Sequence, residues 1–252
     1  MAHFSRCKVF SSCPAFSFYD SVIIVEMLQS FIGHQAELAN LPPGSSISTS
    51  ISGTTVTLPR TFNPSLGLLE PSPSNLIAPG TPFSRLYFAT FREPQTKIVE
   101  KSTIVVSIDG ACSDNGTPAA RAAVGVYFGP ESPHNISERI GGVQTSQRAE
   151  IRAAIRALEI VTQALLDDFS VRRVVLLCDS SYVVQSMTEW VFKWRENGWK
   201  NARNGSVVNT NDLKELDEFI DKLCEEGLDV EFWLVGREKN VLADELANRA
   251  CR

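Results

Sequence analysis

The pattern of apolar and polar residues changes abruptly near residue 100. Beyond that point, five short apolar runs are bounded by turn residues, which predicts β-strands. The runs are Thr103–Ile108, Ala122–Phe128, Asn135–Val143, Arg173–Cys178 and Asp229–Val235. The first three follow one another closely, so we expect them to form an antiparallel meander.

Helical periodicity lies between the later strands. Apolar residues recur at a spacing of three or four in Gln147–Leu166, and Asp212–Glu226 is amphipathic. Shorter helical segments are expected at Ser180–Thr188 and Trp190–Trp199, and Asn240 should cap a last helix that runs to about Ala250. A strand–helix–strand connection favours parallel pairing of the first and fourth strands. The predicted fold class is therefore α/β, with a five-stranded mixed sheet flanked by helices.

The part before residue 101 has a different composition. It holds 10 of the 13 prolines, and its basic and acidic residues balance, so the net charge of −5 lies in residues 101–252. Residues 40–84 have few large apolar residues in any period and read as a linker. We therefore expect residues 1–100 to be a low-charge, Pro/Ser-rich and mostly disordered extension, and residues 101–252 to be the folded domain.

The net charge and the spacing of the cysteines argue against several classes of protein. A pI near 5.3 argues against a protein that coats nucleic acid by bulk charge, but not against a carboxylate cluster whose charge a metal offsets. The six cysteines form no CxxC pair, which argues against a zinc site or a disulfide framework and favours an intracellular protein. No apolar stretch is long enough to span a membrane. We expect the protein to be a monomer. Its compartment could be the nucleus, the cytoplasm or the mitochondrion.

Four acids stand out by position. Asp109 and Asp179 each follow a strand, and strands one and four should be parallel neighbours, so these two carboxylates should meet. Glu150 lies on the face of its helix that should contact the sheet, and Asp244 lies in a largely apolar helical segment. A single acid after a strand is most often a cap, but four that converge without obvious cationic partners favour a metal site.

The preferred metal follows from the ligands. Carboxylate oxygens are hard donors that suit Mg²⁺ or Mn²⁺. Two such ions can clamp the attacking and leaving oxygens of a phosphodiester. The four acids thus predict metal-dependent phosphodiester hydrolysis.

Four motifs in order resemble type 1 ribonuclease H. They are Val106–Cys112, Thr145–Glu150, Leu177–Ser180 and Ala243–Ala247. The resemblance covers about residues 103–251, and a further match runs from Ser181-Tyr182-Val183 into the tryptophans that follow. It implies the ribonuclease H-like fold, with Asp109, Glu150, Asp179 and Asp244 as the catalytic acids that bind two Mg²⁺ ions. The implied reaction is endonucleolytic hydrolysis of the RNA strand of an RNA–DNA hybrid, which leaves 5′-phosphate and 3′-hydroxyl ends.

The resemblance also implies substrate-binding residues. Those expected to contact the minor groove and read the 2′-hydroxyl are Cys112, Asn115, Ser146, Gln147 and Ser181, and sequence specificity should be low. Ser146 and Ser181 depart from the residues common at those places, which puts two groove contacts in doubt.

The segment Trp190–Arg203 resembles the basic protrusion of the family. Trp199, Lys200 and Arg203 are the candidates to grip the DNA strand. Trp190 and Trp194 lie four apart, so they are equally well explained as core residues.

One departure concerns the loop before Asp244. Arg237 stands where many members have a histidine, and the short Arg-Glu-x-Asn loop resembles an archaeal, plant and fungal branch. Arginine cannot act as a general base at neutral pH but can hold a phosphate. Two alternatives therefore stay open: a weak or inactive nucleic-acid-binding module, and a nuclease acting on double-stranded RNA.

Overall fold

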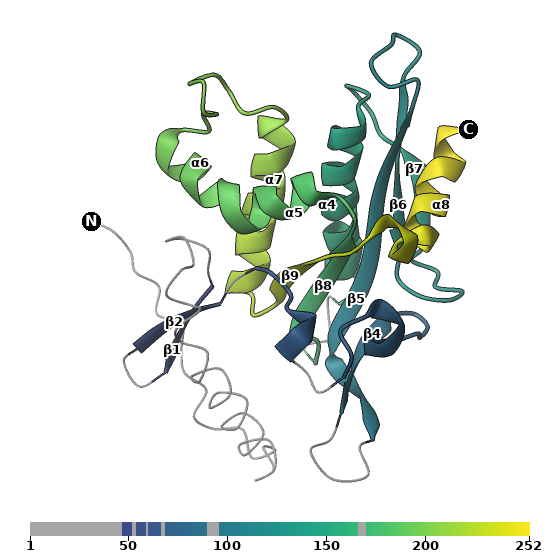
Figure 1. Cartoon of the computed structure of the whole chain (residues 1–252), viewed down its shortest axis with the longest axis vertical. Helices are drawn as coiled ribbons and strands as arrows, with labels where there is room; N and C mark the ends of the chain where they lie inside the picture. Colours follow the sequence, from purple (N-terminus) through teal and green to yellow (C-terminus); the bar gives the residue numbers. More distant parts are fainter. Residues whose placement is uncertain (1–46, 52–53, 59, 67–68, 90–95, 166–169) are drawn as a thin grey trace. The chain divides into compact units, whose positions relative to one another are not determined.

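The computed structural model describes residues 47–51, 54–58, 60–66, 69–89, 96–165 and 170–252. Strands β1 (Ile47–Ile51) and β2 (Thr54–Leu58) pair in a two-stranded antiparallel sheet of their own. The later described residues form the folded body that carries the site (Figure 1). Among the described residues, no helix combines the length and apolar character needed to cross a bilayer.

The main sheet has seven strands. They are β3 (Ile77–Ala78), β4 (Ser84–Ala89), β5 (Lys97–Ser113), β6 (Arg121–Tyr127), β7 (Ile136–Arg139), β8 (Arg173–Cys178) and β9 (Asp229–Leu234). β5 pairs antiparallel with β6 and parallel with β8, while β7 extends the sheet beyond β6 and β9 beyond β8. The predicted five-stranded mixed sheet is therefore confirmed, in the order β7-β6-β5-β8-β9. β4 pairs antiparallel with the first part of β5, and β3 pairs antiparallel with β4.

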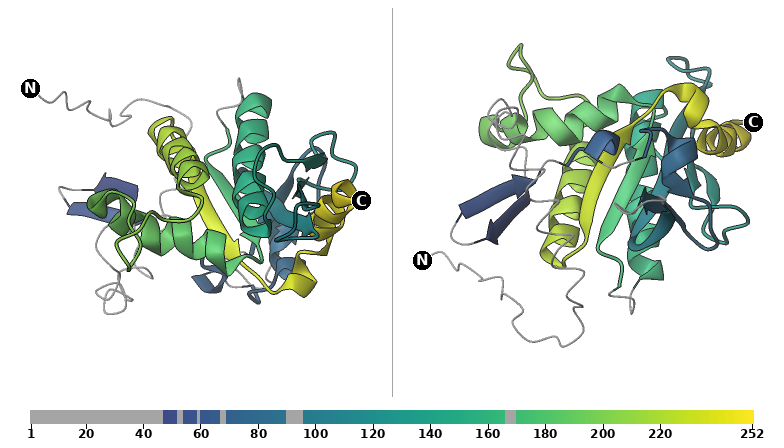
Figure 2. Two further views of the ribbon diagram at one scale, coloured as in Figure 1. Left: turned by 90° about the horizontal axis from the view of Figure 1, so that it is seen from above. Right: turned by 60° about the horizontal axis from the view of Figure 1, so that its bottom comes forward.

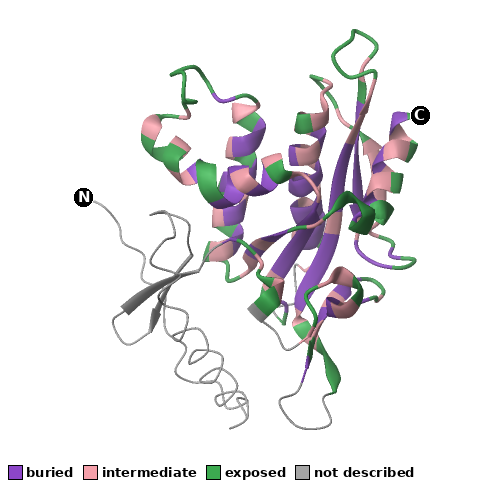
Figure 3. Ribbon diagram, in the orientation of Figure 1, coloured by how far each residue is buried: buried purple, intermediate pink, exposed green. Residues whose placement is uncertain are grey.

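Helices α4 (Ser146–Ala164) and α7 (Thr210–Glu225) cover one face of this sheet. Alternate residues of the central strands, such as Ile104, Val106 and Leu176, pack beneath them in the main hydrophobic core. Figure 3 shows these strands buried along most of their length. Burial of this continuous apolar face is the main force that fixes the sheet and both helices.

Helix α8 (Val241–Cys251) lies on the opposite face. Two glycines show that α4 and α8 lie on opposite faces. A side chain at Gly110 would collide with the backbone of α4, and a side chain at Gly125 would collide with the backbone of α8. Gly110 pairs with Val124, the residue before Gly125, and successive residues of a strand point to opposite faces. The two views in Figure 2 show the same separation of α4 and α8. These glycines let both helices approach the sheet closely.

A second hydrophobic core lies on the face opposite α4 and α7. Val105, Val175 and Trp233 contribute from the sheet, and Leu76 and Leu86 cover them from the segment before residue 90. That segment contains the short helices η1 (Pro64–Leu66) and α3 (Pro73–Leu76) as well as β3 and β4.

The predicted linker over residues 40–84 is therefore wrong for the described part of residues 60–84. Leu69, Leu76 and Ile77 lie between prolines without a regular period, so periodicity did not reveal them. Each is ordered by an apolar face that the sheet already presents. Strands β1, β2 and β4 and the first residues of β5 likewise form where a mostly disordered extension was predicted. Residues 1–46, the first part of that extension, lie outside the described residues.

Three short helical segments connect β8 to α7. These are α5 (Ser181–Gln185), the π-helical turn η2 (Ser186–Trp190) and α6 (Val191–Asn197), which follow one another without a break (Figure 1). Gly198 ends α6 in a left-handed conformation, the usual way to stop a helix. The short helix η3 (Arg237–Lys239) precedes α8.

Candidate active site

Asp109 lies inside β5, which continues to Ser113, so the prediction that it follows the strand is wrong. Asp179 directly follows β8, the parallel neighbour of β5. Residues 103–107 of β5 pair in register with residues 173–177 of β8, which puts Asp109 level with Asp179. Asp109 is 2% exposed and Asp179 is partly exposed. Their carboxylates interact electrostatically, and this repulsion helps to raise the pKa of Asp109. The structure therefore brings these two acids close together, as the sequence predicts.

Glu150 approaches Asp109 from α4. The Thr145 side chain accepts a hydrogen bond from the Arg148 amide (3.3 Å), which caps the helix and fixes its first turn. Gly110 has no side chain to keep Glu150 away, since an added Cβ would collide with the Glu150 backbone. Glu150 therefore lies against the strand that carries Asp109.

Both acids have strongly raised pKa values. Burial is the largest cause, followed by neighbouring carboxylates, and together they raise the pKa of Asp109 to about 7 and that of Glu150 to about 9. Asp109 Oδ2 and Glu150 Oε2 are buried with no hydrogen-bond partner in the described structure. Such orphaned acceptors are costly, so they mark a place where a cation or a proton is needed.

Asp244 joins this group from the first turn of α8. Its Oδ1 accepts from Arg237 Nη2 at 2.6 Å, and its Oδ2 accepts from Asn248 Nδ2 at 2.9 Å. Repulsion from Asp244 contributes to the raised pKa of Asp109, which the Arg237 charge opposes. Arg237 is 75% exposed, so it reaches this cluster of acids from the solvent side.

Asn240 is a component that sequence reasoning assigned differently. It stands at the N-cap position of α8, but its side chain makes no capping hydrogen bond. Instead, Asn240 Nδ2 donates to the Ile108 carbonyl at 2.9 Å and to Asp179 Oδ1 at 2.7 Å. With 1% exposure, Asn240 ties β5, at the residue before Asp109, to the carboxylate that follows β8.

The donor set fits a divalent cation in its chemistry. Four carboxylates supply hard oxygen ligands, and two of their oxygens are buried and unpartnered. Within the ranges that the structure describes, no three acidic, histidine or cysteine side chains are close enough to form a ready-made metal group. Mutual repulsion keeps carboxylates apart when no positive charge lies between them, so small side-chain movements would have to complete such a site.

Cys178 lies directly below the acids at the end of β8. It is buried, and burial raises the pKa of its thiol well above the ordinary value. A buried neutral thiol is a poor nucleophile, so Cys178 serves as packing.

Four of the five residues predicted to contact the minor groove lie near the end of β5 or the start of α4. Asn115 Nδ2 donates to Ser146 Oγ at 3.3 Å, which joins the turn after β5 to the start of α4. Asn115 and Gln147 are exposed, and Cys112 and Ser146 are partly exposed. Ser181 is exposed at the start of α5, two residues after Asp179. Cys112, Asn115, Ser146 and Gln147 therefore lie within two residues of the end of β5 or the start of α4, and Ser181 lies three residues after the end of β8.

Four rings form a row along α5, η2 and α6, which we call the aromatic row. Centroid distances are 6.3 Å from Tyr182 to Trp190, 5.8 Å from Trp190 to Trp194 and 5.9 Å from Trp194 to Trp199. Trp190 is 37% exposed, whereas Trp194 and Trp199 are partly buried against the main core. Trp194 therefore fits the core interpretation, whereas Trp190 is exposed and Trp199, a binding candidate, packs partly against the core. Contact of the row with a DNA strand stays a prediction.

Three basic side chains lie at the Trp199 end of the aromatic row or in the loop that follows it. Lys200 and Arg203 are exposed in the loop after α6, whose turn is held by side-chain hydrogen bonds of Asn201. Lys214 Nζ lies 5.4 Å from the Trp199 ring centroid. Sequence reasoning missed Lys214, because it lies on a different helix.

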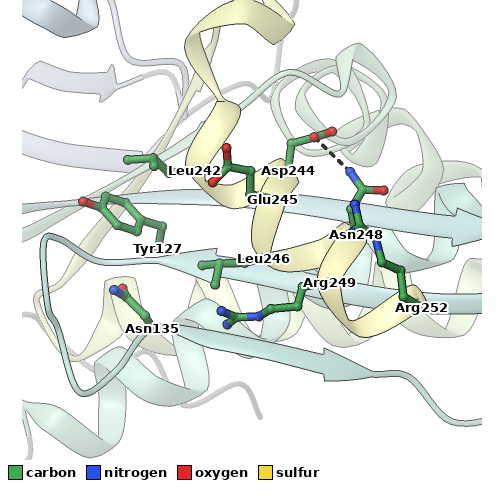
Figure 4. A pocket seen from close by; sticks show the side chains of 9 residues that line it. All are labelled: Tyr127, Asn135, Leu242, Asp244, Glu245, Leu246, Asn248, Arg249 and Arg252. Carbon is green, nitrogen blue, oxygen red and sulfur yellow. Dashed lines mark hydrogen bonds between the residues drawn. The ribbon is translucent and has the colours of Figure 1, made fainter.

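A pocket opens beside α8 next to the four acids (Figure 4). Its volume is about 560 Å³, and it is lined by Tyr127, Asn135, Leu242, Asp244, Glu245, Leu246, Asn248, Arg249 and Arg252. It reaches the acidic cluster only through Asp244, whose bond from Asn248 is drawn in Figure 4. The pocket adjoins the site rather than containing it.

Comparison with known proteins gives a consistent family. A family model described as RNase H matches residues 101–252. Ribonuclease H1 of Rattus norvegicus is 39% identical over 150 residues, which cover 60% of this chain and 49% of that protein. Ribonuclease H of Chromobacterium violaceum is 34% identical over 152 residues, covering 58% of this chain and 92% of that protein. The chain thus spans about half the length of the mammalian relatives that it matches.

Solved structures give similar matches. The chain resembles LC11-RNase H1, whose crystal structure is in complex with an RNA/DNA hybrid, at 28% identity and a TM-score of 0.41. That match covers 58% of this chain and 95% of the other.

Proposed function

The chain belongs to the RNase H family, and we propose that it is a metal-dependent endonuclease that hydrolyses the RNA strand of RNA–DNA hybrids. The observation that carries this proposal is the cluster of Asp109, Glu150, Asp179 and Asp244, two of which hold buried, unpartnered oxygens. The family's general dependence on divalent metals supports the same interpretation. We further propose that the protein acts inside the cell as a monomer.

The four acids would hold two Mg²⁺ ions, or Mn²⁺ in their place. When bound, the two ions would lower the pKa of the attacking water and stabilise the leaving oxygen of the phosphodiester. Asp109 and Glu150 can then stay ionised at neutral pH, because nearby positive charge offsets the burial that raises their pKa values.

Two further residues set the shape of the site. Asn240 holds one oxygen of Asp179 and leaves the other free to bind. Arg237 cannot take a proton from water, so its role is to hold a phosphate oxygen of the RNA strand near Asp244. Engagement of a phosphate would draw Arg237 away from the carboxylate that it contacts in the free protein.

Substrate recognition would come from both sides of the acids. Asn115 and Gln147, with Cys112, Ser146 and Ser181, lie where they can contact the minor groove and detect a 2′-hydroxyl. The aromatic row with Trp199, Lys200 and Arg203 would grip the DNA strand through stacking and charge. Contacts of this kind read the sugar, phosphate and groove shape, so little sequence preference is expected.

A substrate panel tests this proposal. The RNA strand is labelled and presented with complementary DNA, with complementary RNA or alone, in Mg²⁺ and in Mn²⁺. We expect cleavage of the hybrid only, with 5′-phosphate and 3′-hydroxyl ends. Cleavage of double-stranded RNA at a similar rate would favour the second nuclease activity, and tight hybrid binding without cleavage would favour an inactive binding module.

A further inference from the structure

Arg60 lies outside the residues that match the family, yet its side chain is deeply buried. The family match begins at residue 101, and only 4% of the Arg60 side chain is exposed. A buried guanidinium is costly unless its charge and its hydrogen bonds are satisfied. Its partners therefore reveal what the segment around residue 60 does.

The backbone around Arg60 is fixed to the edge of the sheet. The Phe232 amide donates to the Arg60 carbonyl at 2.7 Å, and the Phe62 amide donates to the Phe232 carbonyl at 2.9 Å. Thr61 thus forms a parallel β-bridge with Phe232 of β9. These two bonds set the direction from which the Arg60 side chain enters the protein.

The Arg60 side chain completes a cluster of two arginines and two aspartates. Its Nη1 donates to Asp217 Oδ1 at 2.9 Å, and its Nη2 donates to Asp221 Oδ1 at 2.6 Å. Arg195 donates to the same two carboxylates at 2.5–2.7 Å. Because Asp217 is 4% exposed, its charge depends on both arginines for compensation.

This cluster contacts η2 and α6, two of the elements that carry the aromatic row. Arg195 belongs to α6, and the guanidinium groups of Arg60 and Arg195 lie 5.6 and 5.9 Å from the ring centroid of Phe192 on the same helix. Arg60 Nη1 also reaches the Met187 carbonyl in η2 at 3.4 Å. One side chain from residue 60 therefore contacts η2, α6 and α7, while its backbone is tied to β9.

We propose that Arg60 is a positioning residue for the aromatic row, so that the grip of this enzyme on a hybrid depends on residues 60–62. The proposal rests on the proposed function, since it assumes that the row contacts the DNA strand. Without the guanidinium, Asp217 and Asp221 share a single arginine, and α6 loses a contact to the sheet edge. The row should then become more mobile, while Asp109 and Glu150 keep all their described contacts.

The test uses the full chain with Arg60→Met, which keeps an apolar stem but removes the charge. Arg85→Met is the matched control, because Arg85 comes from the same part of the chain but, among the described residues, its side chain donates to the Lys101 and Thr103 carbonyls rather than to α6 or α7. Hydrogen exchange of the free protein is followed over residues 187–197 and over β5 and β8. Steady-state cleavage of a labelled hybrid gives KM and kcat for each variant.

We expect Arg60→Met to speed exchange in residues 187–197 selectively. It should also raise KM for the hybrid by about twofold to thirtyfold with little change in kcat. Arg85→Met should do neither, and adding Asp221→Asn to Arg60→Met should restore part of the protection by removing the surplus negative charge. Arg60→Lys, which keeps the charge but not the two-pronged contact, should show a smaller effect in the same direction and serves if Arg60→Met does not fold.

Three results would overturn the proposal. They are unchanged exchange over residues 187–197, an equal rise in exchange across β5 and β8, and an unchanged KM. Absence of hybrid cleavage by the wild-type protein would instead count against the proposed function. The exchange measurement needs no substrate, so the two failures can be told apart.

Discussion

Asn240 donates a hydrogen bond of 2.7 Å to Asp179 from a side chain that is 1% exposed. The same amide group also holds the Ile108 carbonyl, one residue before Asp109. Asn240→Ala removes both bonds and frees the Asp179 carboxylate to turn. We expect Mn²⁺ affinity and kcat/KM to fall roughly 10–100-fold, the usual range when a residue that orients a metal ligand is lost. Mn²⁺ titration followed by electron paramagnetic resonance, together with hybrid cleavage, checks this.

The isosteric variant Asn240→Asp sharpens that experiment. It keeps the shape of the side chain but replaces the donor with a further negative charge beside Asp179. Its loss of activity should exceed that of Asn240→Ala. Unchanged Mn²⁺ affinity in both variants, with folding verified by circular dichroism, would show that Asn240 does not position the carboxylate.

The raised pKa values of Asp109 and Glu150 predict how stability depends on pH without metal. Each carboxyl binds a proton more tightly in the folded state, from ordinary values of 3.8 and 4.5 to about 7 and about 9. The free energy of unfolding should therefore fall as pH rises through this window, because the unfolded state releases its protons first. Glu150→Gln should make the decrease in the free energy of unfolding with pH smaller, because it removes one of the two titrating groups.

Urea unfolding in EDTA at pH 5 and pH 8 measures this effect. We expect Glu150→Gln to be more stable than the wild type at pH 8 by on the order of 1–3 kcal/mol, and to differ less at pH 5. Glu218→Gln, which changes an exposed acid on α7, is the control. A difference between Glu150→Gln and wild type that does not change with pH would contradict the assigned burial.

Substitution of Arg237 should affect activity much more than stability. Its side chain is 75% exposed, and exposed ion pairs contribute about 1 kcal/mol or less. Arg237→Ala should therefore change the free energy of unfolding by no more than that. Loss of a charged contact to phosphate should lower kcat/KM for the hybrid about tenfold to hundredfold, with partial recovery in Arg237→Lys. Unchanged kcat/KM would remove Arg237 from the proposed substrate contacts.

The second core predicts where the chain can be shortened. Removal of residues 1–58 leaves Leu76 and Leu86 in place against Val175 and Trp233. Removal of residues 1–100 exposes that apolar face and should lower the free energy of unfolding by about 3 kcal/mol or more. Chemical denaturation of both shortened chains makes the comparison. Equal stability would mean that residues 60–89 contribute nothing to the fold.

The elements with strong periodicity could be predicted from the sequence. The strands and the long helices α4 and α7 each bury a continuous apolar face, and that burial leaves a regular pattern along the chain. The segment at residues 60–89 leaves no such pattern, since its apolar residues are ordered only by a sheet formed later in the chain. One signal was present: the uninterrupted apolar run Val174–Leu177 indicates a strand buried on both faces, which requires a second cover.

The candidate site was predictable to a similar degree. The parallel pairing of the strands brought Asp109 level with Asp179, and the helix positions of Glu150 and Asp244 indicated the other two acids. The family resemblance then implied that all four bind metal. The roles of Asn240 and Arg60 depend on contacts between residues more than 60 positions apart, such as the 2.9 Å bond from Arg60 to Asp217. No local pattern encodes these contacts. An arginine within a proline-rich stretch looks like an ordinary solvated charge until its partners are known.

The central claim is that the four acids form a metal-dependent site that cleaves the RNA of a hybrid. The most direct measurement is gel analysis of a 5′-labelled RNA strand paired with DNA, incubated with wild-type protein or Asp109→Asn. Both proteins are assayed in Mg²⁺, in Mn²⁺ and in EDTA. The account predicts internal cleavage by the wild type in either metal, none in EDTA, and none by folded Asp109→Asn. Cleavage that persists in EDTA or in Asp109→Asn, or no cleavage by folded wild type in either metal, would contradict it.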